Sequence, residues 1–150
     1  MRRRLALATL AALTACKSSW PDENRPPLDA QVRETLRLQV EAWNRGDIRG
    51  FMAGYENSPT TTFISGTHVE RGWKAMLDRF LERYPPGKQG TLSFSETEVT
   101  VLGSGEVAWA TGRFKLTGDV DASGRFTLIL RRSGHRFLIV HDHTAADPKS

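Results

Sequence analysis

Two histidines near the end of the chain, His141 and His143, have the clearest potential for chemistry. They flank Asp142 in the segment IVHDHTAAD, at the end of a run of β-forming residues. Residues two apart in a strand point to the same side, so both imidazoles are expected on the face of Ile139, about 6–7 Å apart. Such histidines can serve as a base, bind a metal or form hydrogen bonds at a pocket wall.

A metal site is the weakest of these interpretations. A zinc site takes at least three protein ligands. The other histidines, His68 in a predicted loop and His135 at a predicted hairpin turn, lack the spacing of a cluster. We therefore predict neither a metal nor a cofactor. The imidazoles are expected at a pocket wall, with Asp142 on the opposite face holding a backbone amide or an arginine of a neighbouring strand.

Four further residues are candidates for binding a small molecule. Arg113 lies in mid-strand and shares a face with Trp109. Its guanidinium can either clamp a carboxylate ligand or form a salt bridge on a sheet surface that faces a dimer partner, and the sequence favours neither. Tyr55 and Trp73 lie at helix ends, where they can offer a hydroxyl and an apolar wall. Core packing is the favoured alternative for Trp73.

Hydrophobic periodicity predicts the helices that must position these residues. Apolar residues recur every three or four positions in segments 28–43, 48–55 and 73–84, which predicts three helices. Asp29 and Asp47 precede the first two stripes and are predicted to cap those helices.

From residue 90 the hydrophobic period changes to two. This period predicts four strands, at 90–103, 106–118, 124–134 and 135–145, after a short β-rich segment at 60–66. Helices followed by a strand meander indicate one α+β domain, with the helices packed on one face of a curved antiparallel sheet.

The first residues resemble a bacterial export signal. A basic start, MRRR, precedes a largely apolar run of nine residues, LALATLAAL, which is too short to cross a bilayer as a stable helix. It ends in LTAC, which resembles the cleavage site of a lipoprotein. We predict that residues 1–15 form a signal peptide and that Cys16, the only cysteine in the chain, carries the lipid.

Residues 16–27 are polar and contain prolines, which predicts a flexible tether between the lipid and the domain. Lys17 after the cysteine favours the periplasmic side of the outer membrane in a Gram-negative cell envelope. Without the three arginines of the signal peptide, 18 basic residues stand against 17 acidic ones, so charge gives no support for nucleic-acid binding. Residues 148–150 are expected to form a tail.

Several motifs together resemble the nuclear transport factor 2-like superfamily. They are AWNRGD, GYENSP, the RGW and RYP around the third helix, GRFTLILRR and IVHDHT, in order within residues 28–147. The likeness is greatest to small bacterial SnoaL-like proteins, which are related to the association domain of calcium/calmodulin-dependent kinase II. The resemblance implies a cone, also called a cystatin-like fold, in which a strongly bent sheet wraps around three helices. It also implies a pocket at the open end and an outer sheet face that commonly forms a homodimer.

The resemblance implies a superfamily that contains both enzymes and non-catalytic modules, so the fold alone does not identify a function. Relatives that isomerise ketones resemble one another in having a carboxylate that points inward from the strand after the early helices. In this chain that strand is segment 60–66, which has no acidic residue. His141 or His143 with Tyr55 are then the catalytic candidates. We expect a lipid-anchored domain that binds a small organic molecule. The alternatives are a cofactor-independent isomerase, dehydratase or hydrolase, and a non-catalytic dimerisation module whose pocket is filled.

Overall fold

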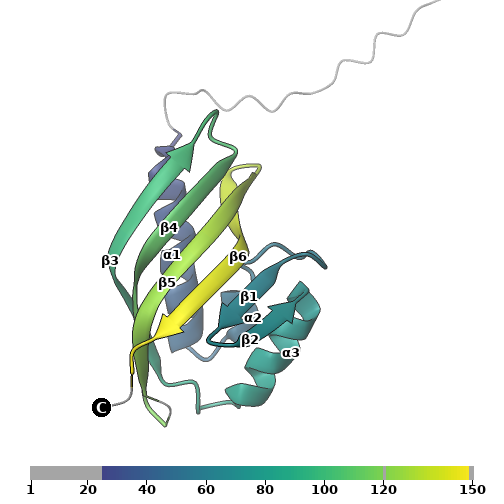
Figure 1. The fold of residues 1–150 in the computed structure, drawn as a ribbon, viewed down its shortest axis with the longest axis vertical. Coiled ribbons are helices and arrows are strands. Elements are labelled where there is room, and N and C mark those ends of the chain that lie inside the picture. Colours follow the sequence, from purple (N-terminus) through teal and green to yellow (C-terminus); the bar gives the residue numbers. More distant parts are fainter. Residues whose placement is uncertain (1–24, 120, 149–150) are drawn as a thin grey trace, which may run out of the picture.

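The computed structural model describes residues 25–119 and 121–148. The elements in chain order are α1 (Leu28–Asn44), α2 (Ile48–Met52), β1 (Thr62–Ser65), β2 (His68–Arg71), α3 (Trp73–Arg83), β3 (Thr91–Leu102), β4 (Val107–Thr117), β5 (Ala122–Ser133) and β6 (Arg136–Ala146). The predicted α+β architecture is confirmed. Figure 1 shows α1 running behind the four long strands, with α2, α3 and the β1–β2 pair at one end of the sheet.

The N-terminal predictions fall largely outside this range. The predicted signal peptide, Cys16 and most of the predicted tether lie outside the described residues. Within the described residues, no helix is both long and apolar enough to span a membrane.

Two acidic residues behave differently at the helix starts. Asp47 caps α2 as predicted, because its carboxylate accepts a hydrogen bond from the Gly50 amide at 2.7 Å. The prediction that Asp29 caps α1 is wrong. The helix already begins at Leu28, directly after Pro27, so Asp29 lies in the first turn without a capping hydrogen bond. Its negative charge there still favours the helix through the helix dipole.

The sheet has six strands in the order β2-β1-β6-β5-β4-β3. Strands β3 to β6 form the predicted antiparallel meander, but β1 pairs in parallel with β6, so the sheet is mixed and not wholly antiparallel. His68, expected in a loop, begins β2, which pairs with β1 around a turn at Gly66 (φ 59°). With four residues, β2 is too short for periodicity to distinguish it from a loop.

The inner face of the sheet packs closely against α1. Ala108 and Ala110 of β4 are fully buried and belong to the core on this face. Thr35 of α1 donates a hydrogen bond from Oγ1 to the backbone carbonyl of Phe137 at 2.7 Å, which ties the helix to β6. The helices and the inner sheet face share one core, whose most buried members include Val32, Met52, Met76, Leu130, Phe137 and Ile139.

Candidate functional site

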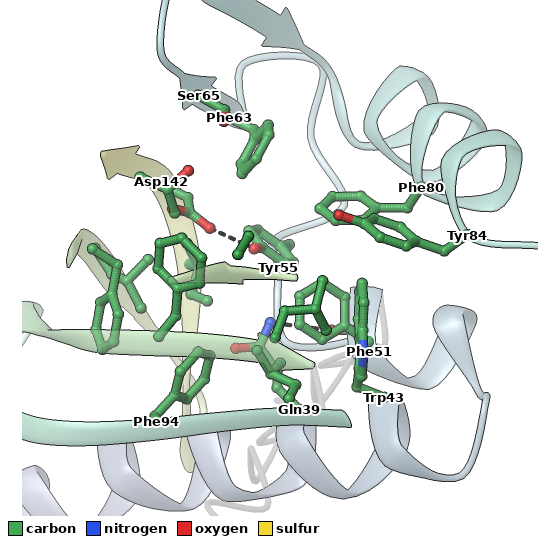
Figure 2. Close-up of a pocket in the computed structure, with 18 of the residues that line it drawn as sticks. Gln39, Trp43, Phe51, Tyr55, Phe63, Ser65, Phe80, Tyr84, Phe94 and Asp142 are labelled. Atoms are coloured by element: carbon green, nitrogen blue, oxygen red, sulfur yellow. Dashed lines mark hydrogen bonds between the residues drawn. The ribbon is translucent and has the colours of Figure 1, made fainter. Parts of the chain in front are cut away.

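A cavity of about 380 Å³ lies between the inner face of the sheet and the three helices. Its wall is mainly aromatic and aliphatic, and Figure 2 shows the rings around a common space. The volume is in the range of pockets that hold small organic molecules. The aromatic side chains of the wall are Trp43, Phe51, Tyr55, Phe63, Phe80, Tyr84, Phe94, Phe114 and Phe126.

A bulge in β6 decides which of its side chains reach the cavity. In the pairing with β5, Leu128 stands opposite Asp142 and Leu130 stands opposite Ile139, so β6 has one residue more than β5 between these pairs. An inserted residue turns the side chains that follow it to the other face of the sheet. Ile139 before the bulge and Asp142 after it therefore both line the cavity.

Tyr55 and Asp142 form a polar pair in this wall. The Tyr55 hydroxyl donates to Oδ2 of Asp142 at 2.6 Å, and the two residues are only 4% and 5% exposed (Figure 2). Backbone hydrogen bonds hold the tyrosine beside β6. The amide of Glu56 donates to the carbonyl of Ile139, and the amide of Ile139 donates to the carbonyl of Gly54, each at 2.9 Å.

Burial changes the protonation of this pair. It raises the pKa of the Asp142 carboxyl to about 7, although the hydrogen bond from Tyr55 acts in the opposite direction. Burial, followed by the charge of Asp142, raises the pKa of Tyr55 well above its usual value, so the phenol keeps its proton. Oδ1 of Asp142 is buried and has no hydrogen-bond partner among the described residues. Near neutral pH, this carboxyl can therefore either donate or accept a proton.

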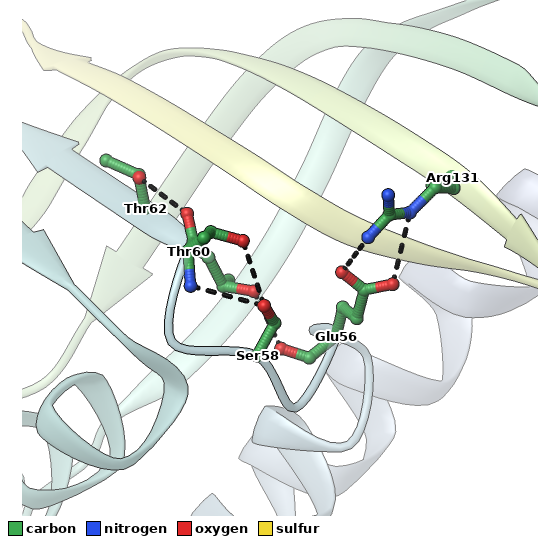
Figure 3. A network of polar contacts seen from close by, with 6 residues as sticks. Glu56, Ser58, Thr60, Thr62 and Arg131 are labelled. Atoms are coloured by element: carbon green, nitrogen blue, oxygen red, sulfur yellow. Dashed lines mark hydrogen bonds and ion pairs between the residues drawn. The ribbon is translucent and has the colours of Figure 1, made fainter.

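The loop from α2 to β1 is fixed by polar contacts on both sides (Figure 3). Arg131 of β5 makes two hydrogen bonds to the carboxylate of Glu56. The hydroxyls of Ser58 and Thr60 are 2.9 Å apart, and the Thr62 hydroxyl donates to the carbonyl of Thr60 at 3.0 Å. These contacts stiffen the loop and restrict the tyrosine that precedes it.

Gln39 of α1 is another buried polar residue of the wall. Its Nε2 donates to the carbonyl of Phe51 at 3.2 Å, and the residue is 1% exposed. Gly54 makes room for it, because a Cβ at this position would lie 2.6 Å from Cγ of Gln39. A larger residue at position 54 would therefore displace the glutamine from the wall.

Because of the bulge, the prediction that both histidines lie at the pocket wall is wrong. Strict alternation places His141 and His143 on the face of Ile139, but neither lines the cavity. His141 is half-buried and His143 is exposed on the other face of the sheet. Asp142, expected on that other face, occupies the wall instead. Tyr55 lines the cavity, as the prediction of a ligand-facing hydroxyl requires.

The remaining predicted residues also lie outside the cavity lining. Trp73 is half-buried at the start of α3, and its indole donates to the carbonyl of Met52 at 2.8 Å, which agrees with the packing alternative. Trp109 is 44% exposed on the outer sheet face. Arg113 lies on the same face and pairs with Asp147 at 2.5 Å, which is the salt-bridge alternative and not a clamp at the cavity.

Sequence reasoning missed Asp142 and two arginines of the cavity, Arg79 and Arg83. Nothing in the local pattern of β6 marks the bulge. The arginines had a usable signal, because they alternate with Phe80 and Tyr84 along α3 and so lie at the edge of its apolar stripe. In residues 25–119 and 121–148, no three His, Cys, Asp or Glu side chains are close enough to hold a metal ion.

Solved structures similar to this chain share the same architecture. An NTF-2 like protein of unknown function from Shewanella oneidensis is 30% identical with a TM-score of 0.73, over 77% of this chain and 97% of that one. A cystatin-like fold protein from Burkholderia xenovorans is 25% identical with a TM-score of 0.65, over 85% of this chain and 97% of that one. A putative calcium/calmodulin dependent protein kinase II association domain from Xanthomonas campestris is 17% identical with a TM-score of 0.62, over 79% and 86%, a likeness of fold alone.

The sequence comparison identifies the family. Residues 32–146 match the SnoaL-like domain, which covers most of the described chain. A comparison with curated proteins gave no match. The resemblance predicted from the sequence motifs is confirmed for both family and fold. The chain belongs to the SnoaL-like domain family, within the NTF2-like superfamily.

Proposed function

We propose that this domain binds a small, mainly apolar organic molecule in the cavity, with a hydrogen-bonding group of that molecule beside Asp142. The cavity has the size and the aromatic lining of small-molecule sites, in which a few polar groups fix the orientation of the ligand. Its presence also disfavours the alternative of a pure assembly module, because that alternative requires a pocket filled by side chains.

The strongest support is the buried carboxyl of Asp142 in the cavity wall. Tyr55 satisfies Oδ2, but Oδ1 has no partner among the described residues. A buried polar atom without a partner costs about 1–3 kcal/mol of stability. A ligand group that bonds to Oδ1 would recover much of this free energy, so the site favours ligands that carry such a group.

Isothermal titration calorimetry with two neutral probes, octan-1-ol and 2-octanone, tests this proposal. The alcohol can donate to the ionised carboxyl and accept from the protonated one, whereas the ketone can only accept. Because the pKa of Asp142 is raised to about 7, we expect 2-octanone to bind more weakly as the pH rises from 6 to 8. The affinity for octan-1-ol should change less over the same pH range.

Two neighbouring positions on β5 give a matched control. Leu128 lines the cavity, whereas Ile129 is 40% exposed on the outer face. Leu128→Phe should weaken both probes about tenfold by occupying the space, which corresponds to about 1.4 kcal/mol, and Ile129→Phe should leave them unchanged. Equal binding by the two variants, or no binding by the unmodified protein, would reject the cavity as the site.

The same pair of residues favours a second candidate, cofactor-independent proton transfer. An acid–base group works best when its pKa lies near the working pH, and the raised pKa of Asp142 meets this condition. The sequence had led us to expect a histidine in this role. Exchange of the α-protons of 2-octanone in D₂O, followed by NMR, measures this activity. Exchange above the buffer rate that disappears in Asp142→Asn would support it, and exchange at the buffer rate would rule it out for this ketone.

We also propose export and lipid anchoring at Cys16, which would hold the domain at the cell envelope. The support is the order of the basic start, the apolar run and LTAC in the sequence. Labelling with a tagged fatty acid in a bacterial host tests it. Label that persists in Cys16→Ser would contradict the anchor.

We propose, in addition, that the domain forms a homodimer through the outer face of the sheet. Trp109 and Ile129 are paired across β4 and β5 and are 44% and 40% exposed, so they offer an apolar centre on this face. Sedimentation equilibrium should give a dimer that Trp109→Glu converts to a monomer. A monomeric unmodified protein would contradict this interface.

A further inference from the structure

Two arginines of α3, Arg79 and Arg83, belong to the more exposed part of the cavity lining. Arg79 is half-buried and Arg83 is exposed, whereas Tyr55 and Asp142 are buried. The arginines are four residues apart, so they lie one above the other on the same side of the helix. The exposed part of the cavity lining is therefore cationic, whereas the acidic residue of the described lining is buried.

Aromatic packing positions one of these arginines. The guanidinium carbon of Arg83 lies 5.7 Å from the centre of the Tyr84 ring, and Nε donates to the Tyr84 hydroxyl at 3.3 Å. The Tyr84 ring in turn packs against Trp43, at 4.7 Å between centres, and against Phe80 at 6.1 Å. Arg83 is thus held by the cavity wall itself.

Neither arginine pairs with a carboxylate in the part of the chain that the structure describes. The nearby acids that form ion pairs have other partners: Asp78 bonds to Lys74 at 2.6 Å, and Glu70 of β2 lies 3.2 Å from His68. Glu82 is exposed on α3 and forms no ion pair with a described residue. Other arginines of the domain, such as Arg113, Arg125 and Arg131, have such partners.

The order of charges determines which end of a ligand can be anionic. Asp142 is the only acidic residue among the described residues that line the cavity. An anionic group beside it would lose its water and meet a carboxyl that is partly ionised near pH 7, whereas beside the arginines it would meet two guanidinium groups and remain partly hydrated. The planar guanidinium also matches a carboxylate with two parallel hydrogen bonds.

We infer that the ligand of this pocket is an amphipathic carboxylate, with an apolar body in the aromatic cavity and its charged group at Arg79 and Arg83. This inference rests on the proposed function, and it names the class of molecule and its orientation. A hydroxyl or carbonyl at the far end of such a molecule would lie next to Asp142.

Three probes with the same eight-carbon chain distinguish the contribution of the head group to the affinity from that of the chain. They are octanoate, octan-1-ol and octylammonium. Their affinities for the purified protein are measured by calorimetry at pH 7, in low and high salt. The test variant is Arg79→Gln/Arg83→Gln. The matched control is Arg49→Gln/Arg71→Gln, which removes two exposed arginines that do not line the cavity.

Octanoate should bind at least about fivefold more tightly than octan-1-ol, and octylammonium most weakly. The preference for octanoate should decrease in high salt and disappear in the test variant, but persist in the control variant. If octan-1-ol binds as well as octanoate, or if the test variant keeps the preference, the anionic head is wrong while the apolar pocket stands. If none of the probes binds, the proposed function fails, and this inference fails with it.

Discussion

The two faces of β6 carry similar polar residues but give them opposite environments. Asp142 faces the helices and is 5% exposed, whereas His141 and His143, its neighbours in the chain, face outward. The carboxyl next to the cavity has a pKa near 7 because it is buried. The face on which a residue lies, and not its type alone, determines which of these three side chains lines the cavity.

The two faces also differ in how their charges are satisfied. On the outer face, Arg113 and Arg131 pair with carboxylates of the same chain, and these pairs remain in contact with water. On the inner face, Asp142 accepts a hydrogen bond from the neutral hydroxyl of Tyr55 and forms no ion pair with a described residue. The outer face is therefore suited to solubility or assembly, and the inner face to binding.

Removing a large side chain from each face measures this contrast directly. Phe137→Ala leaves a cavity in the core, because Phe137 is fully buried, and should reduce the free energy of unfolding by about 3–5 kcal/mol. At a protein concentration low enough to keep the proposed dimer dissociated, Trp109→Ala on the exposed outer face should change it by less than about 1 kcal/mol. Urea denaturation followed by circular dichroism gives both values. Similar losses in the two variants would mean that the outer face is buried, as a dimer requires.

The pH dependence of stability tests the burial of Asp142. Its pKa is raised from 3.8 to about 7, so between these values the folded state holds a proton that the unfolded state has released. Stability should therefore fall as the pH rises from about 4 to 7, by a total on the order of 4 kcal/mol, and then stay level. Asp142→Asn should remove this slope, whereas the exposed control Asp78→Asn should keep it. Identical slopes in all three proteins would show that Asp142 is ionised in the fold.

The smallest effect is expected for the ion pair of the outer face. Arg113 and Asp147 are partly exposed, 32% and 40% for their side chains, so Arg113→Gln should cost less than about 1 kcal/mol, and less still in high salt. Denaturation at two salt concentrations measures this. The octanoate affinity should stay unchanged in the same variant. A clear loss of octanoate binding would restore Arg113 as the anion clamp and break the assignment of the two faces.

The long elements were predictable because their patterns are long. The stripe from Trp73 to Tyr84 has three turns of regular spacing, and it became α3 within one residue of its predicted end. Strands β3 to β6 have eleven or twelve residues each, enough for a period of two to appear. Hairpin β1–β2 has only four residues in each strand, so its parallel contact with β6 left no trace in the local sequence.

The candidate site was predictable only where it depends on one element. Tyr55 was found because a tyrosine at a helix end has an apolar ring and a hydroxyl that needs a partner. Its partner was missed because strict alternation holds only for an unbroken strand. The extra residue of β6 becomes visible only when Leu128 and Leu130 of β5 are paired with it.

The sequence by itself determined the order of the long elements, the family, and the division of β4 and β5 into an apolar and a polar side. These properties depend on residues close together in the chain, so periodicity and motifs record them. The tertiary structure alone decided that β6 is bulged, that Asp142 and Tyr55 meet, and that Arg79 and Arg83 line the same cavity. Each of these depends on segments far apart in the chain, and the burial that shifts the pKa of Asp142 exists only once those segments have packed together.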